Sequence, residues 1–132
     1  MSISRSTQYG LIAASYVAQN HKSGLIKAER VSKTYKLPLT YLLKIMQQLV
    51  KARILASKRG PGGGYSLARP ANKISLLELV EAVEGPVGGD LYIAEQAGNE
   101  AFSLKIEAAC REATERSKKV YAKVKLSQVI AG

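Results

Sequence analysis

Two cations and four glycines stand close together in residues 58–65, which read Lys-Arg-Gly-Pro-Gly-Gly-Gly-Tyr. Cations attract phosphate, and glycine lets a backbone turn sharply and approach a partner closely. A glycine-rich nucleotide cradle would instead end in Gly-Lys-Ser/Thr at the start of a helix. Here the glycines lead into a strand-like Tyr-Ser-Leu segment, which disfavours nucleotide binding. The pattern indicates a basic β-hairpin tip that contacts DNA through Lys58, Arg59, Gly60, Gly62 and Gly63.

Residues 38–52 form a second candidate for contact with DNA. Their apolar residues recur at helical spacing, and Pro38 suits the first turn of a helix. The expected buried stripe is Leu39, Leu42, Leu43, Met46, Leu49 and Val50. The opposite face carries no acid, and its Thr and Gln side chains can hydrogen-bond base edges while Lys neutralises phosphates. We expect DNA contacts from Thr40, Tyr41, Lys44, Gln47, Gln48 and Lys51.

The elements that must position these residues are predicted mainly as helices. Apolar spacing predicts a helix from about residue 4 to 20 and a short helix over 28–35 that turns Ala28, Val31 and Tyr35 inward. The short helix, a tight turn and helix 38–52 make a helix-turn-helix. Strands at 54–57 and 65–68 flank the glycines. The expected fold is mainly α (α+β), a winged helix-turn-helix with a two-stranded β wing.

Charge is distributed unevenly along the chain. The 132 residues carry 20 Lys/Arg and 10 Asp/Glu, a formal net charge of +10. Residues 1–75 hold 13 of the basic residues and a single acid, Glu29. On charge alone, a solvated basic surface and a polyanion-binding surface fit equally well. The glycine hairpin and the acid-free helix face favour DNA.

The rest of the chain predicts a second helical region. Ser75 and Glu78 match a capping box, and Gly85 ends the helix that they begin. Residues 87–98 contain three glycines and read as a flexible connector, after which Asn99 would cap a long helix over 100–123. A short docking turn with Leu126, Val129 and Ile130 would follow. The apolar face of the long helix predicts dimerisation, with a helix folded over its own domain as the alternative; this face is Phe102, Ile106, Ala109, Ala113 and Val120.

Several classes of protein are disfavoured by composition. The single Cys110 excludes an internal disulfide and fits a reducing cytoplasm. We expect its side chain to be a buried small hydrophobic group, with a redox switch as the alternative. The only histidine, His21, falls in a polar turn, and no catalytic set is recognisable, so we expect no enzyme. No apolar run approaches the roughly 20 residues that cross a bilayer, and the N-terminus lacks an apolar signal core.

Five strings in the chain match a known pattern, and its opening, Tyr-Gly-Leu at 9–11 followed by Ala13 and Ala14, is similar too. The five are Leu-Thr-Tyr-Leu at 39–42, Lys-Ala-Arg-Ile-Leu at 51–55, the wing with its flanks at 58–70, Ile-Ser-Leu at 74–76, and Glu-Ala-Val-Glu-Gly-Pro at 81–86. Together they resemble the IscR/NsrR/CymR-type (Rrf-type) family of bacterial winged-helix transcriptional regulators, over residues 3–86 and in outline over 87–132. The resemblance implies a homodimer on a palindromic operator, with recognition helices in major grooves and Arg59 of each wing in a flanking minor groove.

The sequence also departs from the pattern of that family. Leu43 and Lys44 stand where Glu-Gln is frequent, and Pro38 replaces a serine, so the resemblance implies a different operator. Members with an iron–sulfur cluster place three cysteines in the equivalent of about residues 88–106, where this sequence has none. We therefore expect a member without the cluster cysteines, with no cofactor and no metal.

The resulting hypothesis divides the chain into a DNA-binding domain (1–86), a connector (87–98) and a dimerisation helix with its docking turn (99–132). It describes a cytoplasmic, homodimeric repressor that binds double-stranded DNA. The alternatives are control through a regulatory partner protein, docked on the more acidic helical part after residue 76, or through oxidation of Cys110.

Overall fold

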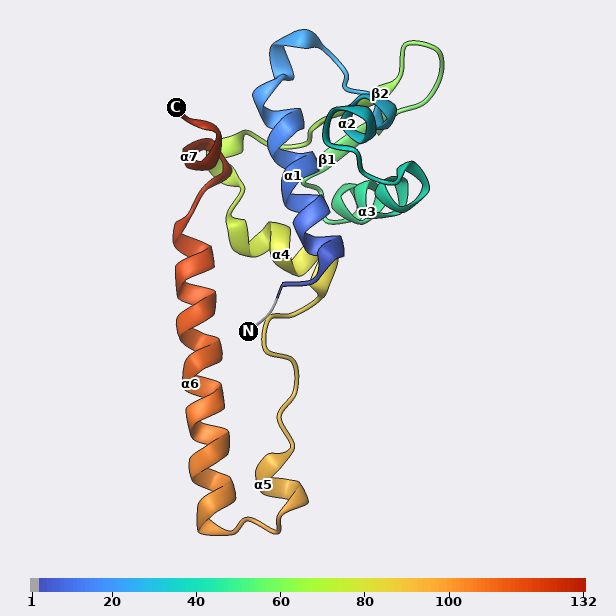
Figure 1. Ribbon diagram of the computed structural model, residues 1–132. Coiled ribbons are helices and arrows are strands. Elements are labelled where there is room, and N and C mark those ends of the chain that lie inside the picture. Colours follow the sequence, from blue (N-terminus) through green and yellow to red (C-terminus); the bar gives the residue numbers. More distant parts are fainter. Residues whose placement is uncertain (1–2) are drawn as a thin grey trace.

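The computed structural model describes residues 3–132, and most of them are helical. A head domain contains the N-terminal helices, the hairpin and the C-terminus, and a long arm extends from it (Figure 1). The fold class that the sequence predicts is confirmed. The helices are α1 (Arg5–Gln19), α2 (Ala28–Tyr35), α3 (Leu39–Lys51), α4 (Leu76–Glu84), α5 (Ile93–Gln96), α6 (Ala101–Lys123) and α7 (Leu126–Ile130); the strands are β1 (Leu55–Lys58) and β2 (Gly64–Leu67), and η1 (His21–Ser23) and η2 (Ala71–Lys73) are 3₁₀ turns.

The core of the head lies where α1 packs against α3 and α4. Small Ala13 and Ala14 of α1 are fully buried, which lets the neighbouring helices approach α1 closely. The buried stripe of α3 differs in part from the expected one. Ile45 is buried, whereas Leu39 and Leu43 are 36% and 40% exposed, so their expected burial is wrong. The reason is that α1 covers the side of α3 that carries Ile45, and the stripe is rotated toward that side.

The turn between α2 and α3 fixes the geometry of the helix-turn-helix. Lys36 adopts the left-handed conformation (φ 56°), and Leu37 is buried behind it. The Leu37 amide donates to the carbonyl of Ser32 at 3.0 Å. Pro38 precedes α3 as an extended N-cap residue instead of occupying its first turn. Tyr35 is also corrected: its ring is 43% exposed and packs edge-on against Tyr16.

The chain returns from the arm and docks on the head. The amide of Leu126 donates to the Ile74 carbonyl at 2.8 Å, and the amide of Leu76 donates to the Val124 carbonyl at 2.8 Å. Leu126 is buried in the core, whereas Val129 of the same short helix is exposed. The capping box expected at Ser75 is present, so one end of α4 is fixed by its own cap and by the returning chain.

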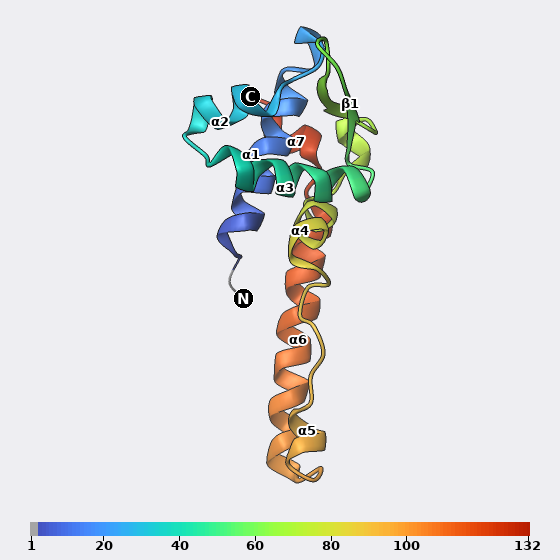
Figure 2. The same cartoon turned by 90° about the vertical axis from the view of Figure 1, so that its right-hand side faces the viewer.

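The connector between α4 and α6 is more ordered than the expected flexible segment. It contains α5 and runs alongside α6 (Figure 2). Gly88 approaches α6 so closely that an added Cβ would lie 2.2 Å from Cγ2 of Thr114. The N-cap of α6 is Glu100, and Asn99, the expected cap, instead takes a left-handed turn (φ 60°) and donates its amide to the Ala94 carbonyl.

Glu84, the last residue of α4, lies where the chain leaves the head for the arm, and it is hydrogen-bonded to the start of α1. Its Oε1 accepts from the Ser4 amide at 2.8 Å and from the Thr7 hydroxyl at 2.7 Å. Hydrogen bonds from Ser4 and Thr7 hold the pKa of the Glu84 carboxyl below its ordinary value of 4.5. Because this folded-state pKa is depressed, the ionised carboxylate stabilises the fold above the unfolded-state pKa, and the contribution is lost as the pH falls through the folded-state value.

We predict that Glu84→Gln lowers the melting temperature at neutral pH, because a neutral amide accepts weaker hydrogen bonds than a carboxylate. The difference from wild type should shrink as the pH falls below 4.5 and vanish below the folded-state pKa of Glu84. Thermal melts followed by circular dichroism over this pH range test the prediction, with exposed Glu95→Gln as the matched control. A difference in melting temperature between Glu84→Gln and wild type that stays constant with pH would contradict this prediction.

Candidate nucleic-acid interface

One face of α3 presents polar and cationic side chains to solvent. Thr40, Lys44, Gln47 and Lys51 are exposed and recur at spacings of four, three and four residues, so they share one side of the helix. Gln48 lies half-buried at the edge of this face. The buried stripe of Leu42, Ile45, Met46 and Leu49 occupies the opposite side and holds α3 against the head.

Tyr41 is held against α1. Its hydroxyl forms a hydrogen bond with the hydroxyl of Ser6, and its ring meets that of Tyr9 edge-on with centroids 5.8 Å apart. The side chain is still 43% exposed. Tyr41 therefore fixes the first turn of α3 relative to α1 as well as presenting a polar edge to solvent. Sequence reasoning placed Tyr41 on the outer face but missed both partners, because they lie more than 30 residues away in the chain.

The wing is anchored to the segment before α2. Strands β1 and β2 pair in antiparallel register, with Lys58 opposite Gly64. On the other edge of β2, Tyr65 and Ile26 exchange two backbone hydrogen bonds of 2.9 and 2.8 Å. Gly64 makes this close pairing possible, because a Cβ there would lie 2.9 Å from the Ile26 carbonyl oxygen, and its φ is +152°. The sequence motif indicated a hairpin but gave no signal for this third, one-residue strand.

The tip of the wing is closed by its glycines. Gly60 has φ +104°, and the amide of Gly63 donates to the Gly60 carbonyl at 2.9 Å. Gly63 is buried inside the turn, and Gly62 is exposed beside it. The expected contact residues Lys58, Arg59, Gly60 and Gly62 are thus presented at the surface, while Gly63 shapes the turn.

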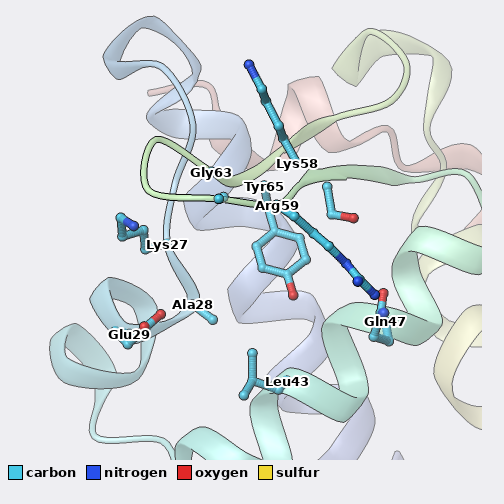
Figure 3. Close-up of a pocket in the computed structure, with 12 residues that line it drawn as sticks. Lys27, Ala28, Glu29, Leu43, Gln47, Lys58, Arg59, Gly63 and Tyr65 are labelled. Carbon is cyan, nitrogen blue, oxygen red and sulfur yellow. The ribbon is translucent and has the colours of Figure 1, made fainter.

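A hollow of about 210 Å³ separates the wing from α3. The Arg59 side chain extends across it toward Gln47, Lys58 points away, and the Tyr65 ring reaches in above Leu43 (Figure 3). Burial, and then the charge of Glu29, raise the pKa of the Tyr65 phenol. The hollow is open and bordered by more cations than acids; its lining is Lys27, Ala28, Glu29, Leu43, Gln47, Ser57, Lys58, Arg59, Gly60, Gly63, Gly64 and Tyr65.

Arg69 braces the base of the wing. Its guanidinium donates to the carbonyls of Arg53 and Lys73, both at 3.0 Å, and forms an ion pair with Glu78 at 3.0 Å. These contacts connect the end of β2 to the first turn of α4. Arg69 therefore serves the fold, whereas the Lys58 side chain points away from the hollow and Arg59 reaches across the hollow toward Gln47.

Cys110 and His21 lie in separate elements, α6 and η1, and do not share a site. Cys110 is exposed on α6, so its expected burial is wrong. His21 lies in η1, where its Nδ1 is 3.0 Å from the Ala18 carbonyl oxygen. Within residues 3–132, no three His, Cys, Asp or Glu side chains are gathered so that they could hold a metal ion. In the same range, no helix combines the length and apolarity needed to span a membrane.

Comparison with known proteins identifies the family of this winged-helix architecture. The sequence model of a family described as "Rrf2: Iron-dependent Transcriptional regulator" matches residues 3–132. The chain belongs to the Rrf2 family. Among Rrf2-type relatives, the regulator IscR of Cereibacter sphaeroides is 40% identical over 89 residues, which cover 66% of this chain and 57% of IscR. The chain spans about three fifths of the length of the curated relatives it matches.

Solved structures of similar proteins share the whole fold, including the arm. CymR, the global cysteine regulator of B. subtilis, superposes with a TM-score of 0.78 at 24% identity, and the match covers 98% of this chain and 96% of CymR. IscR of T. potens superposes with a TM-score of 0.74 at 22% identity, covering 98% of this chain and 86% of its own. At such identities the likeness shows the fold alone. The family resemblance expected from the sequence is confirmed.

The family description mentions iron, and the donors of this chain do not fit an iron–sulfur cluster. Such clusters need four side-chain ligands gathered at one place, mostly thiolates. This sequence has one cysteine and one histidine, on α6 and in η1, and even when doubled across a dimer they belong to separate elements and supply only two thiolates. We therefore derive no role for a cluster here.

The two neighbouring glycines of the wing tip should tolerate substitution differently. A Cβ at Gly63 would lie 2.1 Å from the Lys58 carbonyl oxygen, whereas a Cβ at Gly62 meets nothing within 4 Å. We predict that Gly63→Ala lowers the free energy of unfolding by about 1–3 kcal/mol, because the turn must open. Gly62→Ala is the matched control and should be close to neutral. Urea unfolding measures both, and equal midpoints for the two variants would contradict the role assigned to Gly63.

Proposed function

We propose that this protein is a sequence-specific DNA-binding transcriptional regulator that acts as a homodimer on a palindromic operator. The observation that carries the proposal is the acid-free exposed face of α3, set beside an anchored basic wing. A helix in the major groove and a wing at its flank is the arrangement that such a surface fits. Family membership supports a role in transcription.

The chemistry of each side chain determines which part of the DNA it contacts. Thr40, Gln47 and Gln48 hydrogen-bond to base edges. Tyr41, near the start of α3, contacts the sugar–phosphate backbone of the DNA. Arg59 enters the flanking minor groove, whose negative potential attracts guanidinium groups. The exposed Gly60 and Gly62 let the wing backbone come close to the duplex. The phosphate contacts come from Lys44, Lys51 and Lys58.

The exposed face of α6 supports the homodimer. Phe102, Ile106 and Val120 are 55%, 47% and 62% exposed, and Ala109 and Ala113 between them are exposed as well. The connector and α5 cover a different side of α6, through Gly88 and Ala94. The stripe is therefore free for a second copy, and its central alanines allow two helices to approach closely. A two-fold axis through this contact would present two recognition helices to the two halves of a palindrome.

The regulator acts as a repressor by occupying promoter DNA, without an iron–sulfur cluster. Of the two control mechanisms that the sequence leaves open, oxidation of Cys110 is favoured by the exposure of that thiol. Nothing observed in residues 3–132 favours control by a docked regulatory protein in the same way.

We predict a steep salt dependence for binding to duplex DNA. If each protomer neutralises about four phosphates, the slope of log K against log salt is about −7 for the dimer. Arg59→Ala should weaken binding and reduce the slope by about 2, because each protomer then places one cation fewer against the DNA, beside the phosphate contacts of its three lysines. Fluorescence anisotropy at several salt concentrations measures both quantities.

Lys105→Ala, an exposed cation of the arm, is the matched control for Arg59→Ala and should leave the slope unchanged. An unchanged slope in Arg59→Ala would remove Arg59 from the interface. Failure of the wild-type protein to bind any duplex at low salt would overturn the proposed function itself.

Two adjacent alanines of α6 provide a matched test of the dimer. Ala109 lies in the apolar stripe, and Ala108, which is also exposed, points elsewhere because successive helical residues are turned by about 100°. We predict that Ala109→Arg gives a monomer in analytical ultracentrifugation and lowers operator affinity at least tenfold, since only one half-site is then bound at a time. Ala108→Arg should remain dimeric. Monomers in both variants, or in neither, would contradict the assigned face.

A further inference from the structure

Leu43 occupies an unusual place on α3. Its side chain is 40% exposed and borders the hollow beside the wing. Lys44 follows Leu43 in the chain, and Gln47 lies one turn further along the same side of the helix. The Tyr65 ring lies above Leu43 (Figure 3). A large apolar group therefore sits at the edge of a face that is otherwise polar or cationic. The expected role of Leu43 as a core residue does not account for this position.

We propose that Leu43 reads the C5 methyl group of a thymine in the operator, an inference that rests on the proposed function. In the major groove each base edge offers hydrogen-bond donors or acceptors, and thymine alone adds an apolar methyl group. A leucine neither donates nor accepts hydrogen bonds. Its contact with a polar base edge would displace water from that edge without replacing the lost hydrogen bonds. The methyl group is the one feature that it matches.

The surroundings of Leu43 favour such a point contact. Gln47 is one helical turn away and, with a bidentate amide, is suited to an adjacent base. Lys27 and Arg59 line the same hollow against the single acid Glu29, and Lys58 projects outward beside it, so this region attracts the phosphate backbone of a duplex. The rim formed by Tyr65 and the wing would exclude water from the methyl contact once DNA is bound.

Deoxyuridine tests the proposal, because it differs from thymidine only by the missing methyl group. Duplexes are first selected from genomic fragments with the wild-type full chain, and each thymine of the selected site is then replaced singly by deoxyuridine. Wild type should lose about fourfold in affinity at one thymine of a half-site, the effect of removing one buried methyl group. Leu43→Ala should bind the thymine and deoxyuridine duplexes equally well. Leu39→Ala, which changes the other exposed leucine of α3, should keep the wild-type sensitivity.

The outcomes separate this inference from the function on which it rests. If wild type binds DNA selectively but is indifferent to deoxyuridine at every position, the inference is wrong. It is also wrong if Leu43→Ala retains the full loss, because another residue then reads the methyl group. If no duplex is selected at all, the proposed function falls together with the inference. A circular dichroism melt that matches wild type establishes that Leu43→Ala is folded.

Discussion

The pairing of Ile26 with Tyr65 is the contact on which the arrangement of the interface depends. Two backbone hydrogen bonds join the segment before α2 to the outer edge of the wing, and Ile26 itself is buried. A two-stranded hairpin alone is marginally stable in water. With this third partner, the wing and the helix-turn-helix become one unit, and the hollow between them has a defined shape. The absence of a side chain at Gly64 is the sequence requirement for this contact.

A second set of contacts connects the end of α4, where the arm begins, to the start of α3 through the first two turns of α1. Glu84 at the root of the arm accepts from Ser4 and Thr7, and between these two residues Ser6 bonds Tyr41 of α3. A dimer that reads two half-sites needs a fixed distance between its recognition helices. In the proposed dimer, that distance would depend on how α3 is held relative to the arm, and the start of α1 contacts both α3 and Glu84 at the end of α4.

Local signals in the sequence predicted most of the fold, and non-local contacts account for what it missed. The bounds of α2 and the capping box at Ser75 follow from short-range patterns and agree with the structure. The candidate site was predicted as residue types on a helix face and a hairpin. Its internal geometry was not, because the bridge from Ile26 and the partners of Tyr41 join distant segments. Leu43 was misplaced for a related reason: leucines on two sides of a helix fit several stripes, and only the packing of α1 selects one.

Charge decides which partner each exposed apolar surface can meet. Leu43 lies in the part of the chain with 13 basic residues and one acid, whereas the stripe of α6 lies in the part with seven basic residues and nine acids. A duplex is attracted to the first part and gains nothing electrostatically from the second. The stripe repeats along a 23-residue helix, which a second helix can cover over its length, while a single leucine amid polar groups suits a single methyl group. In the proposed regulator, the same physical property, exposed apolar area, would therefore serve assembly on the arm and base recognition on the head.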